Sequence, residues 1–269
     1  MSITGAELAR AFPVRRRFFA AGDGGTLLRW ATLALLLCFW EAGARIAGNT
    51  GLIAAPTSVV RALFAQVLSD ADVRGALFSA VLEISAAYAL AVTGGLLIGL
   101  AVGWTRFGRN SMFPIVLLFY AIPQAVLLPL FTLGFGIGPA AKIAFGCSHG
   151  IFPVIVNTVA GMRDINPLYV SAARAMGASR PDIIRNVILP HMVGSFFAGL
   201  RLAMTMTLLG VILAELYVST GGIGFYTRQF ADNFDPAPLF ALVLSLAMIA
   251  IAMNALVRVA ERRYTRWKN

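Results

Sequence analysis

Charged side chains are scarce in this sequence of 269 residues. Asp, Glu, Lys and Arg make up 13% of it, about half the roughly 25% of a typical globular domain. Nonpolar residues make up 59%, and the mean hydropathy is +0.80. A single core of this size cannot hide that much apolar surface from water. The composition therefore excludes a soluble globular protein and predicts an integral membrane protein.

Lysine, cysteine and histidine are nearly absent, with two of each. Neither Lys142 nor Lys268 follows a glycine, so the sequence has no GxxxxGK[ST] nucleotide-binding loop. Cys38 and Cys147 lie in apolar runs and are interpreted as small hydrophobic residues rather than a disulfide. Cys147 and His149 are too few ligands for a metal site. We find no nucleophile–base pair and no paired carboxylates suited to catalysis, and predict no enzyme activity, bound cofactor or metal in this chain.

Long runs without charge locate the membrane spans, because a charge at the bilayer centre costs about 2.5–3.5 kcal/mol on insertion scales. Two further apolar segments contain charges: one holds Glu41 and Arg45, spaced to pair on one helix face, and the other holds Arg201 and Glu215. The charge-free runs and these two segments together predict an all-α protein with six transmembrane helices. The predicted spans are 28–47, 84–105, 110–141, 143–162, 193–217 and 236–257.

The third run, at 110–141, is too long for one plain span. We predict a helix near 112–133, kinked at Pro123 and Pro129, with a tight loop at the glycines of 134–138. Broken helices line cavities more often than they face lipid, so Pro123, Gln124 and Pro129 are candidate pathway residues. Close helix packing is the preferred explanation for the stripe of Gly95, Gly99 and Gly103.

Three charged residues at or within the spans need an explanation. Glu215 is an intramembrane acid, which makes it a candidate functional residue along the pathway, with an interfacial polar contact as the alternative. Arg201 is too far along the same helix to pair with it. Glu83 lies at the edge of a charge-free run and is interpreted as an interfacial charge.

A short amphipathic helix, capped by Thr57 or Ser58, is predicted over 56–69.

The distribution of arginine predicts the orientation. With six helices, the termini and the loops at 104–111 and 162–192 share one side, which holds sixteen basic residues against five on the other. The positive-inside bias then places both termini in the cytoplasm. A cleaved signal peptide is disfavoured because the basic segment is too long and Glu41 interrupts the apolar run. The expected division is a cytoplasmic segment 1–27, a membrane domain 28–262 and a cytoplasmic tail 263–269. The net charge of +10 follows from this bias. Nucleic-acid binding is not predicted, because the arginines form no aromatic-interleaved patch.

The cytoplasmic connection 163–190 is built from helix-terminating residues rather than linker residues. Asn166 and Pro167 are typical of a helix start, and Gly177 suits the left-handed position after a helix end. Ser179 and Asp182 fit a capping box that opens a second short helix, which Pro190 is expected to end. We predict a rigid helical hairpin whose first helix exposes the small side chains of Ser171, Ala172 and Ala173.

The segment SAARAMGASRPDIIRNVILP resembles the "EAA" loop of permeases in ATP-binding-cassette importers, whose pattern is E-A-A, three residues, G, nine residues, I-x-L-P. Ser171 replaces the glutamate of the pattern and Val187 its isoleucine. APTSVVRAL, IPQAVLLPLFTLGFGIGPAAKI and GVILAELYVSTGGIGF are similar to permeases of the taurine, alkanesulfonate and nitrate type. The likeness runs from about residue 30 to 262. The coupling residues that it implies are Ser171, Ala172, Ala173, Met176, Gly177, Leu189 and Pro190.

The resemblance implies a type I importer permease in the bacterial inner membrane. It also implies several partners: a separate cytoplasmic ATPase in two copies that binds ATP and Mg²⁺, a second permease copy, and a periplasmic solute-binding protein. We expect a homodimer of permeases. The solute is expected to be small and polar, such as a sulfonate, taurine or nitrate. A secondary transporter or channel, and a membrane-embedded enzyme, are the alternatives; the sequence has neither the internal repeat of the first nor the acid or histidine cluster of the second.

Overall fold

The computed structural model describes residues 23–48 and 53–264, and the chain divides into two units, residues 1–58 and 59–269. Most of the predicted terminal segments 1–27 and 263–269 lie outside the described residues. The first unit contains helix α2 (Asp23–Ala47) and the start of α3 (Pro56–Ala62). Glu41 pairs with Arg45 at 2.6 Å, as predicted, and also accepts hydrogen bonds from the amide and hydroxyl of Thr57. Because those donors go to Glu41 and α3 begins at Pro56, the predicted cap at Thr57 or Ser58 is wrong.

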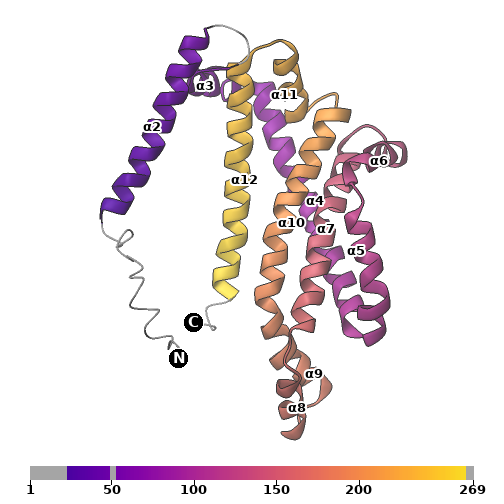
Figure 1. Cartoon of the computed structure of the whole chain (residues 1–269). Helices are drawn as coiled ribbons and strands as arrows, with labels where there is room; N and C mark the ends of the chain where they lie inside the picture. The colour runs from indigo at the N-terminus through magenta and orange to yellow at the C-terminus, as the bar shows by residue number, and fades with distance from the viewer. Residues whose placement is uncertain (1–22, 49–52, 265–269) are drawn as a thin grey trace, which may run out of the picture. The chain divides into compact units, whose positions relative to one another are not determined.

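The second unit is a bundle of long helices, shown in Figure 1. Helices α4 (Ala71–Trp104), α7 (Pro139–Arg163) and α10 (Leu189–Val218) pack against one another, and α12 (Pro236–Tyr264) packs against α10. Their shared core includes Ile84, Val154, Ala203 and Val211, all inaccessible to solvent. Five helices of the described residues are long and apolar enough to cross a membrane, α2 among them. A bent pair supplies a sixth span if it crosses as one.

The bent pair confirms a broken third span and corrects where it breaks. A π-helical turn (Gly108–Met112) leads into α5 (Phe113–Ala121), and a 3₁₀ turn (Gln124–Leu127) leads into α6 (Leu128–Phe135). The two halves meet at 81°. Pro123 lies at the break, in extended backbone, whereas Pro129 lies in the first turn of α6, where a proline needs no intrahelical partner. Pro129 therefore begins a helix instead of kinking one. The predicted loop follows, with Gly136 at φ +77°.

Short helices occupy both ends of the bundle. Helices α8 (Pro167–Ala175) and α9 (Arg180–Ile183) lie at one end, and α11 (Ile223–Asp232), which was not predicted, lies at the other (Figure 1). A π-helical turn (Ile184–Ile188) joins α9 directly to α10, so the helix is continuous from Arg180 to Val218. The expectation that Pro190 ends the helix is wrong, because Pro190 falls in the first turn of α10, just after the widened turn.

The glycines of α4 bring it into close contact with α7, as predicted. A Cβ on Gly95 would lie 2.7 Å from the Cβ of Val154, and one on Gly99 would lie 2.7 Å from the Cβ of Thr158. Gly103 lies one further turn along, opposite the sulfur of Met162, a flexible side chain that can move aside. Separations below about 3 Å between carbon atoms are repulsive, so only a residue without a side chain permits this spacing of the two helices.

We expect Gly95→Ala to destabilise the protein by about 1–3 kcal/mol, because the added methyl overpacks the α4–α7 contact. The matched control is Gly75→Ala, in the same helix, where a Cβ would meet nothing within 4 Å. The control should be neutral or slightly stabilising, since alanine favours helix more than glycine does. Thermal unfolding in mild detergent measures both, and equal melting temperatures for the two variants would contradict the close packing.

Candidate functional site: the α8 loop and a buried ion cluster

The loop between α7 and α10 is fixed by its own backbone and side-chain hydrogen bonds. Asn166 Oδ1 accepts from the amide of Leu168 at 3.0 Å and begins α8. At the other end, Gly177 takes φ +83°, its amide donates to Arg174, and the amide of Ala178 donates to Ala173. This pair of bonds is a Schellman motif, which requires a left-handed residue at the glycine. The predicted helix start and turn are both confirmed.

A capping box opens α9. The Ser179 amide donates to Asp182 Oδ2 at 3.0 Å, and the Asp182 amide donates to Ser179 Oγ at 3.4 Å. These bonds fix the direction in which the chain leaves the turn and enters the long helix toward α10. The loop is thus a hairpin with capped helix ends at Asn166 and Ser179, which agrees with the sequence prediction.

The exposed surface of the hairpin differs from the expected one at a single position. Ser171, Ala172, Met176 and Gly177 are exposed, with Met176 at 82% of its full surface. Ala173 is 6% exposed, because it faces the side of α8 that packs on the rest of the hairpin. A large side chain at Ala173 would therefore disturb the hairpin itself, and Ala172 is the better probe of a partner surface. Leu189 is exposed and Pro190 half-buried where α10 begins.

At the opposite end of the bundle, three charged side chains from three helices meet inside the protein. Lys142 Nζ lies 2.8 Å from Glu83 Oε1 and 3.1 Å from Glu215 Oε1. The side chains are 9%, 5% and 0% exposed for Lys142, Glu83 and Glu215. Each glutamate offsets the cost of removing the ammonium from water, and together they tie α4, α7 and α10 to one another. We call these three residues the ion cluster.

The ion cluster also holds α11. Glu215 Oε2 accepts the amide of Gly224 at 3.1 Å. Gly222 takes φ +100°, and a Cβ there would lie 2.5 Å from Glu215 Oε1. A Cβ on Gly224 would similarly lie 2.6 Å from the Cβ of Glu215. The chain between α10 and α11 can therefore fold back over the carboxylate only because both positions are glycine.

Two expectations from the sequence are corrected by the ion cluster. Glu83 is a buried member of the ion cluster and not an interfacial charge, and Lys142 lies within the first turn of α7 and does not precede the span. A charge does not always end a span, because charges of opposite sign that neutralise each other can lie inside it. The signal that would have found the ion cluster is the isolation of Glu83, Lys142 and Glu215 within apolar sequence. Arg201, which is too far along α10 to reach Glu215, pairs with Glu261 of α12.

The candidate pathway residues do not come together in one site. Pro123 and Pro129 are exposed, and Gln124 Oε1 accepts from the hydroxyl of Ser148 on α7 at 3.1 Å. Pro129 lines a cavity of about 500 Å³ between the bent span, α7 and α10, which also includes Thr132 and Tyr217. Glu215 is buried in the ion cluster and does not line this cavity.

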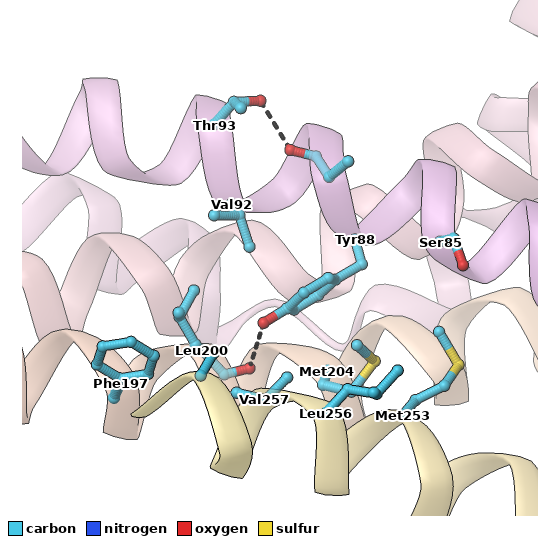
Figure 2. A pocket seen from close by; sticks show the side chains of 12 residues that line it. Ser85, Tyr88, Val92, Thr93, Phe197, Leu200, Met204, Met253, Leu256 and Val257 are labelled. Carbon is cyan, nitrogen blue, oxygen red and sulfur yellow. Dashed lines mark hydrogen bonds between the residues drawn. The ribbon is translucent and has the colours of Figure 1, made fainter. Parts of the chain in front are cut away.

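A second cavity, of about 560 Å³, lies between α4, α10 and α12 (Figure 2). Its wall is mostly apolar, and it carries the hydroxyls of Ser85, Tyr88 and Thr93. Each hydroxyl donates to a backbone carbonyl, as Tyr88 does to Leu200 at 3.2 Å. A polar solute would find no uncommitted hydroxyl proton among these three groups. This cavity suits apolar groups such as acyl chains and is a poor binding site for an anion.

The chain is similar to transport permeases along most of its length. Residues 91–266 match the family described as "Binding-protein-dependent transport system inner membrane component". The formylaminopyrimidine transport permease protein ThiX of Halalkalibacterium halodurans is 27% identical, over 87% of this chain and 93% of its own. The taurine transport system permease protein TauC of Escherichia coli is 29% identical, over 88% of each chain. Among solved structures, a chain of the inward-facing MetNI methionine ABC transporter superposes with a TM-score of 0.58 at 20% identity, covering 74% of this chain and 96% of that one.

Replacing Lys142 by Met should destabilise the protein by about 3–5 kcal/mol, because it leaves two glutamates buried without a counter-charge. The triple variant Glu83→Gln/Lys142→Met/Glu215→Gln should recover most of that loss, since it removes every charge of the ion cluster and keeps the side-chain volumes similar. Thermal unfolding of the purified variants in detergent compares them. A triple variant no more stable than Lys142→Met would contradict the electrostatic account.

Proposed function

Because the chain belongs to the binding-protein-dependent transport system inner membrane component family, we propose how this permease works and what it carries. It is a multi-pass inner-membrane permease subunit of an ATP-binding-cassette importer, and the family implies an ATPase and a binding protein as partners. Membership favours this function over a secondary transporter or channel. The proposal concerns the solute, the side on which each partner docks, the copy numbers and the residues involved.

The α8 hairpin is the proposed docking site for the ATPase. The supporting observation is its construction: the Schellman turn at Gly177 and the capping box at Ser179 make a rigid hairpin that exposes Ser171, Ala172 and Met176. These positions coincide with the EAA pattern. Ser171 has no carboxylate, so docking rests on shape and small side chains rather than on a charge at that position. Ala173 acts from within, by holding the hairpin, whereas Leu189 and Pro190 form the first turn of α10.

The proposed orientation places both termini and the α8 hairpin in the cytoplasm and α11 on the periplasmic side. Arginine is concentrated at the α8 end, which agrees with the positive-inside bias. The division into segments 1–27, 28–262 and 263–269 is proposed on the same basis. Two copies of the permease, as a homodimer, would bind two ATPases. Those ATPases would hold ATP and Mg²⁺, so this chain itself would catalyse no reaction and bind no cofactor or metal.

The proposed solute is a small polar molecule, with a sulfonate, taurine or nitrate-like anion preferred. Relatives are named for formylaminopyrimidine, aliphatic sulfonates and taurine, which are all small and polar. The pathway is proposed along the bent third span, at Pro123, Gln124 and Pro129, where the helix break frees backbone groups. Glu215 is proposed to support the outer end of this pathway through the ion cluster rather than by touching the solute.

Ala172→Arg should abolish copurification of the ATPase, because a long charged side chain would prevent close approach to the exposed face of α8. The control is Ala231→Arg, which is also exposed and helical but lies in α11 at the other end of the bundle. The tagged chain is coexpressed with its ATPase and purified in mild detergent, and the ratio of the two proteins is measured. ATPase at the wild-type ratio with Ala172→Arg would contradict the docking site. Uptake of taurine into liposomes by the chain alone, driven by an ion gradient, would instead favour a secondary transporter.

A further inference from the structure

Holding three helices together through the ion cluster requires the desolvation of three charged groups, which costs free energy. Two carboxylates face one ammonium, and all three side chains are at least nine-tenths buried. Buried ion pairs seldom add more stability than well-packed apolar residues of the same volume. Glu83 Oε2 is moreover buried with no hydrogen-bond partner within the described structure. A buried polar atom without a partner is rare and requires an explanation.

The unpartnered oxygen gives the ion cluster a second possible arrangement. In the structure, the ammonium of Lys142 bridges one oxygen of each glutamate, and Ser79 also donates to Glu83 Oε1 at 3.3 Å. If the last turn of α10, which carries Glu215, shifts with α11 relative to the first turn of α7, Lys142 can exchange Glu215 for Glu83 Oε2 and remain paired. Glu215 would keep the amide of Gly224 as its donor. The ammonium keeps a counter-charge in both states, whereas Glu215 loses its counter-charge in the second, which disfavours that state until α11 is displaced.

The position of the ion cluster connects the two ends of the protein. On one side, Glu215 and Gly224 hold α11. On the other, Lys142 lies in the first turn of α7, which runs as one helix, with Pro153 inside it, to Arg163, about 30 Å at 1.5 Å per residue. Three residues then lead to α8 at Pro167. A shift of the first turn of α7 can therefore reach α8 through this helix, in which Pro153 removes one backbone hydrogen bond.

We propose that the ion cluster is the joint through which the α11 end signals to the α8 hairpin, with Lys142 as the positioning residue that exchanges carboxylate partners. This proposal rests on the function proposed above, in which the binding protein docks at the α11 end and the ATPase at the α8 end. Docking of the loaded binding protein would shift α11 and Glu215 and release α7. The ion cluster then couples docking of the binding protein to the ATPase, in addition to stabilising the fold.

The test uses the full complex of permease, ATPase and binding protein in lipid nanodiscs, with the binding protein as purified from the native host. ATP hydrolysis is measured with and without the binding protein. For Glu83→Gln/Lys142→Met/Glu215→Gln we expect basal hydrolysis within about twofold of wild type, and stimulation by the binding protein reduced at least tenfold. Unchanged stimulation in a variant of normal thermal stability would overturn the proposal, since a purely structural ion cluster would then suffice.

A matched control removes another ion pair from the same bundle. Arg201→Met/Glu261→Gln neutralises the contact between α10 and α12, which does not involve α7. Stimulation should remain within twofold of wild type in this control. An equal loss of stimulation in the control and in the triple variant would overturn the specific role of the ion cluster, because any lost ion pair would then uncouple the complex.

A second variant disturbs the joint without changing any charge. Gly222→Ala places a methyl group against Glu215 Oε1 at a φ that disfavours alanine. We expect the same pattern of retained basal and reduced stimulated hydrolysis. Should the triple variant fail to assemble, this variant decides, and normal stimulation in it would overturn the proposal. A wild-type complex that shows no stimulation by the binding protein would contradict the proposed function itself, which is a different outcome.

Discussion

The exclusion of uncompensated charge from the apolar interior is the constraint on which this structure depends. Lys142 is buried in the first turn of α7, and it is tolerated there because Glu83 and Glu215 approach it from two other helices. Taking such ions out of water is costly unless the geometry of pairing is good. The ion cluster therefore requires α4, α7 and α10 to meet in one arrangement, and the backbone of α11 completes it through Gly224.

Close helix packing makes that arrangement rigid. Glycines on α4 meet Val154 and Thr158 of α7, and glycines at 146 and 150 of α7 meet Val211 and Thr207 of α10 in the same manner. In a bilayer, where apolar contact with lipid competes with apolar contact between helices, such small-residue interfaces provide the packing that holds helices together. The result is a closely packed three-helix core with short helices at each end.

The two ends of the core are built differently. The α8 hairpin is stabilised by local hydrogen bonds between residues only a few positions apart, and it presents small exposed side chains. The α11 end is stabilised by contacts between residues far apart in the sequence and presents an amphipathic helix above a buried carboxylate. The first design gives a firm surface. The second gives a surface whose position depends on which oxygen the ammonium of Lys142 contacts.

The sequence by itself determined the membrane class, the spans, the short helix near residue 56 and the α8 hairpin. These depend on local composition or on motifs within a few residues, such as Asn166-Pro167 and Ser179 with Asp182, and such signals do not need the rest of the fold. It misplaced Pro190 as a helix end and Ala173 as exposed, since neither the π-helical turn nor the packing of α8 is visible in local pattern. Only the tertiary structure decided the ion cluster, the 81° break of the third span and the pairing of Arg201 with Glu261. The physical reason is that a charge in apolar sequence indicates only that a partner of opposite charge is needed. Which helix supplies that partner depends on three-dimensional packing.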